Sequence, residues 1–197
     1  MFEMPTLVMM HGMTGTSEMM KPFAKSILPE GWNLLTPEAS FSHPKRGFTW
    51  WRYEKEDEPR KRLLSSKELA DVDASLHELS NQIPEGPLVL GGFSQGGAMA
   101  QELLHLPLAS RVIGVICIAT RCIRPLELQH TLQHLPPQKL LWMHGEKDAR
   151  VTFDAGKEIV EVFNKSGWDV SSIAHKKGHM IPVEYHANIK DWLYDLR

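Results

Sequence analysis

Short apolar runs alternate with amphipathic stretches along this chain. Runs with few polar residues predict strands that are buried on both faces, at residues 6–10, 88–90, 112–118 and 140–143. Weaker runs predict two further strands, at residues 33–36 and 170–174. Apolar side chains at helical spacing predict helices at residues 65–83, 154–166 and about 183–196, and another that begins at Thr16 or Ser17. This alternation is typical of an α/β fold, and we expect a mostly parallel sheet of about six or seven strands with helices on both faces.

Two segments depart from the alternation. Residues 37–64 are irregular, with aromatic side chains among prolines and charges. Residues 121–137 fit either a short amphipathic helix or a segment that covers the core. Long irregular segments in compact domains are more often functional than accidental, so the 37–64 segment is a candidate part of a site.

The composition narrows the functional classes. The 197 residues fit a single domain at 1–197, and a net charge of −2 gives no electrostatic preference for nucleic acid or an anionic membrane. The first apolar run is too short for a signal peptide or a membrane span, so no stable membrane insertion is expected. Cys117 and Cys122 are too few for a disulfide scaffold and suit a reducing compartment. We therefore expect a cytoplasmic protein.

The most informative stretch is residues 88–101, where an apolar run passes through a glycine-rich turn into helix-forming residues. Gly92, Ser94 and Gly96 match G-x-S-x-G, the turn that exposes a nucleophilic serine between a strand and a helix in α/β-hydrolases. Side chains at the two glycine positions would crowd the backbone as the turn closes. The start of a helix also supplies unpaired N–H groups that favour a developing negative charge. Ser94 is therefore the candidate nucleophile.

A nucleophilic serine needs a base to take its proton and an acid to orient that base. In α/β-hydrolases these residues follow in the order serine, acid, histidine, each in a loop after a strand. Asp148 and His179 each follow a predicted strand in that order. Glu146 is the second choice for the acid. His175 ends a strand, whereas His179 follows Gly178, which lets its loop turn inward.

The tetrahedral intermediate of acyl transfer also needs an oxyanion hole. One donor is the backbone N–H of the residue after the nucleophile, Gln95. The other comes from a loop after an early strand, and His11-Gly12 opens such a loop. We assign this second donor to the N–H of Met13.

With His11-Gly12, GFSQGG at residues 92–97, Asp148 and Gly178-His179, the chain resembles the phospholipase/carboxylesterase family, which includes the acyl-protein thioesterases. The resemblance spans nearly the whole chain, and GFSQGG is its most specific part. It implies an α/β-hydrolase fold that hydrolyses carboxylic esters or thioesters through a serine-bound acyl intermediate.

The resemblance also implies that no metal and no other cofactor takes part. His130 and His134 lie four residues apart, but no glutamate or third ligand accompanies them, so they do not predict a metal site. The chain is too short for a large lid domain.

The acyl pocket is where the chain departs from the family. Relatives usually carry a Ser-Gly turn where this chain has Ala119-Thr120-Arg121, and an acidic residue often seen after His-Gly in the oxyanion loop is missing. Trp50 and Trp51 are candidates for the wall of the acyl pocket, and they fit equally well as residues that cover the core.

Alternative functions stay open at this point. The chain fits another hydrolase on the same fold, such as a lysophospholipase or a peptidase, or a non-catalytic binding protein with a hydrolase-like fold. The sequence predicts an ester or thioester substrate, small or carried on a larger molecule, but neither its acyl length nor whether the chain forms a homodimer.

Overall fold

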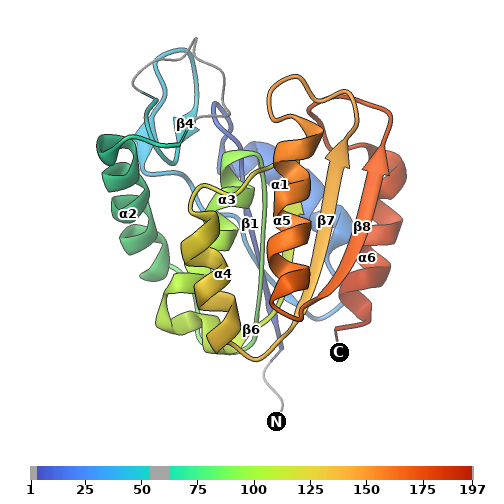
Figure 1. Ribbon diagram of the computed structural model, residues 1–197. Coiled ribbons are helices and arrows are strands. Elements are labelled where there is room, and N and C mark those ends of the chain that lie inside the picture. Colours follow the sequence, from blue (N-terminus) through green and yellow to red (C-terminus); the bar gives the residue numbers. More distant parts are fainter. Residues whose placement is uncertain (1–3, 54–62, 197) are drawn as a thin grey trace.

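A six-stranded parallel sheet forms the centre of the molecule (Figure 1). The computed structural model describes residues 4–53 and 63–196. Within them the strand order is β2-β1-β5-β6-β7-β8, and every neighbouring pair is parallel. The strands are β1 Thr6–Met10, β2 Asn33–Leu35, β5 Leu88–Phe93, β6 Val112–Ile118, β7 Lys139–Gly145 and β8 Asp169–His175. The predicted mostly parallel sheet is confirmed.

Helices cover both faces of this sheet, as predicted. The α-helices are α1 Ser17–Ile27, α2 Ser66–Ser80, α3 Gln95–Glu102, α4 Pro125–His134, α5 Phe153–Lys165 and α6 His186–Tyr194. Figure 1 shows α2 to α5 on one face, with α1 and α6 together on the other. Short 3₁₀ turns follow α3 at Leu103–His105 and Pro107–Arg111, and another at Val183–Tyr185 precedes α6.

The two layers of helices explain the continuous apolar runs. In β1, Val8 and Met10 enter the core beneath α2 to α5, while Leu7 and Met9 enter the core beneath α1 and α6. The same alternation holds in β5, β6 and β7. Because each side chain of such a strand meets a core, a polar residue on either face would be buried without water.

Helix ends follow the sequence signals, with two differences. Ser65 and Glu68 form the predicted capping box of α2, and the Thr16 hydroxyl accepts from the Met19 N–H at the start of α1. Although proline is usually excluded from helix interiors, Pro22 lies inside α1, and its missing N–H removes one helical hydrogen bond. Helix α2 ends at Ser80, before the predicted end at 83.

The segment predicted to be irregular contains a small antiparallel hairpin, formed by β3 Phe41–Ser42 and β4 Phe48–Thr49. Gly47 makes its turn possible, because its φ is +60° and a Cβ there would lie 2.5 Å from the Thr14 carbonyl oxygen. The charged residues 54–62 of the same segment lie outside the described residues. The ambiguous segment 121–137 contains helix α4.

Backbone hydrogen bonds continue past the carboxyl ends of the strands. The Ser94 N–H donates to the Ile118 carbonyl, and the Ala119 N–H donates to the Met143 carbonyl. These bonds hold the loops after β5, β6 and β7 side by side at one edge of the sheet, where α/β proteins bind their ligands. In the described part of the chain, no helix is long and apolar enough to cross a membrane.

The close approach of the turn after β5 to β1 gives a test of the packing. A Cβ at Gly96 would lie 2.2 Å from the Met10 carbonyl oxygen, so we expect Gly96→Ala to lower the free energy of unfolding by about 3 kcal/mol or more. In the matched control Gly178→Ala, the nearest atom lies at an ordinary 3.5 Å, and the change should stay within about 0.5 kcal/mol. Urea unfolding measures both, and equal midpoints for the two variants would contradict this packing.

Candidate active site

The turn between β5 and α3 places Ser94 in a strained backbone conformation. Its φ is 55° and its ψ is −119°, a region that few residues other than glycine adopt. A Cβ at Gly92 would lie 2.2 Å from the Gly96 carbonyl carbon, so this turn can close only around glycines. The result is a half-buried serine at the start of a helix, where it lines two cavities.

The side chain of Gln95 ties this turn to the segment after the hairpin. Gln95 is buried; its Oε1 accepts from the Trp50 N–H at 3.0 Å, and its Nε2 donates to the Trp51 carbonyl at 3.1 Å. The Thr49 hydroxyl lies 2.8 Å from the same Oε1. Because one amide makes these contacts, residues 49–51 are fixed relative to Ser94.

The loop after β1 is held by the same hairpin. The Thr14 N–H donates to the Phe48 carbonyl at 2.9 Å, and the Phe48 N–H donates to the Gly15 carbonyl at 3.0 Å. The Gly15 N–H donates to the Gly12 carbonyl. Within the described residues the Met13 N–H makes no hydrogen bond, which leaves it available to a ligand beside Ser94. The Gln95 N–H is equally available, because the first N–H of a helix has no partner within it.

Asp148 and His179 form a hydrogen-bonded pair. His179 Nδ1 lies 2.7 Å from Asp148 Oδ2, and Asp148 Oδ1 accepts from the N–H groups of Arg150 and Val151 at 2.8 and 2.9 Å. Burial would raise the pKa of Asp148, but the hydrogen bonds from His179 and Val151 outweigh it and hold that pKa below its ordinary value. The carboxylate therefore stays charged and accepts from the His179 ring.

A cavity of about 390 Å³ brings His179 and Ser94 to the same wall. The His179 ring packs against Phe93, with ring centroids 4.8 Å apart. Among the described residues Ser94 Oγ makes no hydrogen bond, so the serine and the histidine share the cavity without a direct bond in this structure. Such contacts are often long in the absence of substrate.

The competing residues lie elsewhere. Glu146 is exposed, and its backbone N–H donates to the His175 carbonyl. His175 is buried and stacks on Tyr185, and within the described residues it forms no hydrogen bond or ion pair with Asp148. Gly178, expected to let the loop turn inward, has no left-handed φ and leaves ordinary space for a Cβ. Its conformation therefore does not require glycine, and the Asp148 contact is what distinguishes His179.

The two tryptophans predicted as pocket wall have different environments. Trp50 is fully buried, lines neither cavity beside Ser94, and donates its indole N–H to the His11 carbonyl at 2.8 Å. This places Trp50 in the core, where it holds the loop that contains Met13. Trp51 lines a second, smaller cavity beside Ser94.

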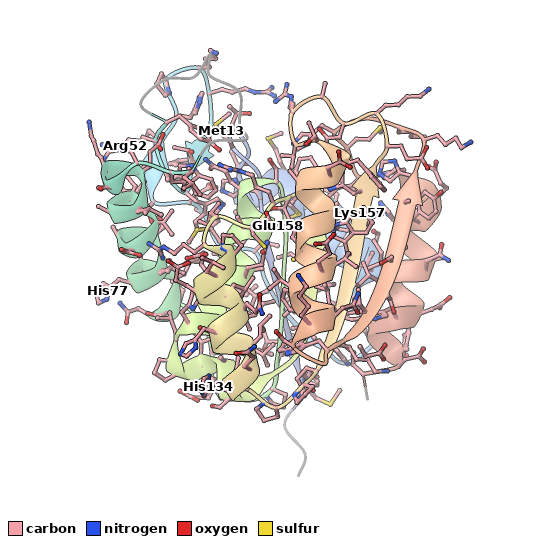
Figure 2. The ribbon with its side chains drawn as sticks, viewed as in Figure 1. Met13, Arg52, His77, His134, Lys157 and Glu158 are labelled. Atoms are coloured by element: carbon pink, nitrogen blue, oxygen red, sulfur yellow. The ribbon has the colours of Figure 1, made fainter. Side chains whose placement is uncertain are left out.

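The histidine pair on α4 lies far from these residues. His134 Nδ1 is 2.8 Å from the His130 carbonyl oxygen, a contact within one helix. Figure 2 shows His134 at the opposite end of the molecule from Met13.

His144, which sequence reasoning missed, lies beneath the acid. Its fully buried ring has Nε2 2.9 Å from the Val151 carbonyl and 3.4 Å from Asp148 Oδ2, so Nε2 carries the proton. Burial lowers the pKa of His144 and keeps the ring neutral. Because Val151 also donates to Asp148, His144 fixes the turn that positions the carboxylate. In the sequence His144 ends an apolar strand, a position that predicts only a buried core residue.

The side chain of His11 also supports the loop after β1. The buried ring has Nδ1 2.8 Å from the Gly12 carbonyl, and Nε2 accepts from the Ala39 N–H at 3.1 Å. Burial lowers the pKa of His11, which suits a neutral ring in these two roles.

Comparisons with known proteins agree with this geometry. The profile of the serine hydrolase (FSH1) family matches residues 3–190. The chain belongs to this serine hydrolase family. A curated relative in Cryptococcus neoformans, named acyl-protein thioesterase 1, is 27% identical over 186 residues, which cover 85% of this chain and 76% of the relative. The resemblance to acyl-protein thioesterases is thereby confirmed.

Solved structures support the fold of this family member. The crystal structure of esterase PE8 superposes with a TM-score of 0.79 at 22% identity, covering 100% of this chain and 94% of that one. Acyl-protein thioesterase 2 of Zea mays gives a TM-score of 0.75 at 19% identity, covering 99% and 94%. At these identities the likeness establishes the α/β-hydrolase fold.

The buried His144 gives a prediction for pH dependence. Since its pKa in the folded state lies below the ordinary 6.5, the unfolded chain binds a proton there that the folded protein does not. Stability should therefore fall as the pH drops below about 6.5, by up to about 1.4 kcal/mol per pH unit for this residue.

His144→Gln keeps an N–H donor but cannot titrate, so its unfolding free energy should fall less steeply between pH 7 and pH 5 than that of the wild type. Urea unfolding across this range measures the slope. His134→Gln, at an exposed position, is the matched control and should retain the wild-type slope. A His144→Gln slope equal to the control would contradict a buried neutral ring.

Proposed function

We propose that this serine hydrolase cleaves carboxylic esters or thioesters, with Ser94 as nucleophile, His179 as general base and Asp148 as the residue that orients His179. The observation that supports it most directly is the 2.7 Å contact between His179 Nδ1 and Asp148 Oδ2 beside the cavity that Ser94 lines. The name of the Cryptococcus relative supports an acyl thioester or ester as substrate.

In the acylation step, His179 Nε2 takes the proton of the Ser94 hydroxyl as Oγ attacks the carbonyl carbon. The N–H groups of Met13 and Gln95 donate to the oxygen that becomes negative. His179 then gives its proton to the departing alcohol or thiol, and the acyl group stays on Ser94 Oγ as an ester.

Deacylation repeats these roles with water as nucleophile. His179 takes a proton from water, the hydroxyl attacks the acyl carbon, and Ser94 Oγ leaves with the proton from His179. Asp148 keeps Nδ1 of the ring protonated throughout, so Nε2 is free to accept in both steps. Each role needs only residues present in this chain.

The two cysteines support a cytoplasmic location within this proposal. Cys117 and Cys122 are both buried and free, and burial raises the pKa of each thiol well above its ordinary range. Inert, unpaired thiols are typical of reducing compartments.

Neutralising the acid separates this mechanism from its alternatives. Asp148→Asn should lower kcat roughly 10³ to 10⁴-fold on an activated ester, because an amide cannot stabilise the required ring tautomer and the imidazolium. Ser94→Ala should show no turnover above background while keeping the wild-type unfolding midpoint.

Glu146→Gln is the matched control, because it removes a nearby exposed carboxylate and should leave kcat within about twofold. A loss below tenfold in Asp148→Asn, with a large loss in Glu146→Gln, would move the acid role to Glu146. Full activity in Ser94→Ala would overturn the proposal.

A further inference from the structure

Two cavities of very different size meet at Ser94. The larger, of about 390 Å³, is also lined by His179, whereas the smaller, of about 20 Å³, is not. Met13, which supplies a proposed oxyanion donor, lines both, and Gln95 lines the smaller one. A substrate carbonyl bound at Ser94 therefore has one roomy side and one narrow side.

The position of His179 decides which part of the substrate each side receives. In the proposed mechanism His179 must reach the leaving oxygen or sulfur to protonate it, so the leaving group lies on the His179 side. The acyl substituent then points the other way, past Gln95 and into the small cavity. The alcohol or thiol enters the large one.

Most of the wall of the small cavity is buried, with half-buried Met13 and Tyr53 at its edge. Trp51, Ala98, Thr120, Arg121 and Val151 line it and are all buried. Its volume holds about one water molecule, which is close to the size of a methyl group. Overpacking a close-packed wall with further methylenes costs about 1–3 kcal/mol.

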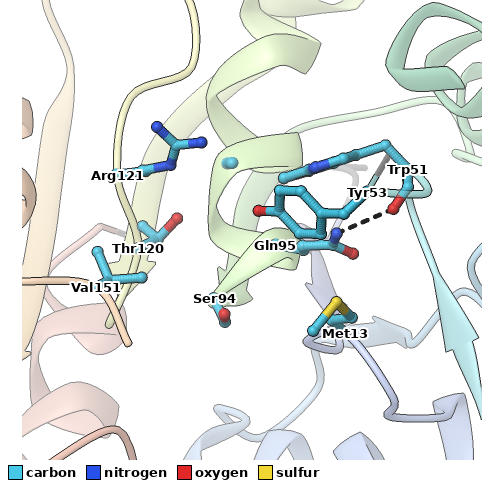
Figure 3. Close-up of a pocket in the computed structure, with 9 residues that line it drawn as sticks. Met13, Trp51, Tyr53, Ser94, Gln95, Thr120, Arg121 and Val151 are labelled. Carbon is cyan, nitrogen blue, oxygen red and sulfur yellow. Dashed lines mark hydrogen bonds between the residues drawn. The ribbon is translucent and has the colours of Figure 1, made fainter. Parts of the chain in front are cut away.

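The chemistry of these walls also disfavours a long alkyl chain. Figure 3 shows Arg121 and Thr120 on one side of the start of α3, and Trp51 and Tyr53 on the other. An alkyl chain offers no hydrogen-bonding group to the polar part of this wall, which includes Thr120 and Arg121. A two-carbon acyl group places the least alkyl surface against it.

The large cavity suits a bulky leaving group, because its lining combines apolar side chains with the cations Arg46 and Arg150. Its apolar lining comes from α1, the end of β5 and the loop after His179, namely Met19, Met20, Phe23, Phe93, Met180 and Ile181. Met19 and Met180 are exposed, and flexible methionines adapt to ligands of different shape.

We propose that this enzyme removes short acyl groups, acetyl foremost, from bulkier alcohols or thiols, and that Tyr53 helps to set the length limit. The proposal rests on the proposed function, because it uses His179 as the group that protonates the leaving atom. Tyr53 is half-buried and packs against Trp51, with ring centroids 5.8 Å apart, so shortening it enlarges the small cavity.

An isomeric pair of esters tests the orientation with composition held constant. Octyl acetate and ethyl octanoate contain the same atoms, with the short group on the acyl side in the first and on the alcohol side in the second. We expect kcat/KM, followed by titration of the released acid, to be at least about tenfold higher for octyl acetate. An equal or higher value for ethyl octanoate would overturn the proposal.

A second series uses p-nitrophenyl esters that differ only in acyl length, from acetate to octanoate. In the wild type we expect kcat/KM to be about 100-fold lower for the octanoate than for the acetate. In Tyr53→Ala we expect this ratio to be at least about tenfold smaller. Tyr53→Phe keeps the ring, and Met19→Ala alters only the large cavity, so both controls should keep the wild-type preference.

These ester assays distinguish failure of the proposed function from failure of the short-acyl preference. If no ester shows turnover that is lost in Ser94→Ala, the proposed function fails. If Ser94-dependent turnover is present but rises with acyl length, only the assignment of short acyl groups fails.

Discussion

The backbone contact between the end of β1 and the turn after β5, at the centre of the sheet, determines where the candidate catalytic residues lie. The turn after β5 approaches the end of β1 so closely that a Cβ at Gly96 would lie 2.2 Å from the Met10 carbonyl oxygen. A helix can begin there only if the chain reverses within one residue, and that residue, Ser94, takes a φ of 55°. The strain at Ser94 is offset by the packing of a sheet buried on both faces. The candidate nucleophile is thus held in place by the fold before any substrate arrives.

The supports around this turn come from segments far apart in sequence. Gln95 binds residues 49–51, and the hairpin binds the loop that contains Met13. On the other side, His144 fixes the turn that carries Asp148. Gln95 and His144 are buried, and the hydrogen bonds that they make hold the candidate catalytic residues in position. The same contacts limit the volume of the smaller cavity, because Gln95 and Trp51 form part of its wall.

The sequence was sufficient to predict the sheet and the candidate catalytic residues, for physical reasons. A strand that is buried on both faces appears in the sequence as a continuous apolar run. Because the strands are parallel, the loops that follow them meet at one edge of the sheet. Ser94, Asp148 and His179 could therefore be proposed from their order and their place after strands. The hairpin at Phe41–Thr49 was missed because its strands are two residues long and are stabilised by contacts with a distant loop. Trp50 and Trp51 could not be told apart, since both are buried and only the tertiary structure shows that Trp51 alone lines a cavity beside Ser94. His144 was missed because a buried polar residue shows its role only through its partners.

The central claim is that Ser94, which the strained turn after β5 holds beside the cavity, is the nucleophile. Labelling of the wild-type protein with a fluorophosphonate, which modifies activated serines, followed by mass spectrometry of its peptides, tests this claim most directly. The account predicts a single modified residue, Ser94, and no labelling of Ser94→Ala. Modification of another serine with Ser94 left intact, or no modification of the folded wild-type protein, would contradict it.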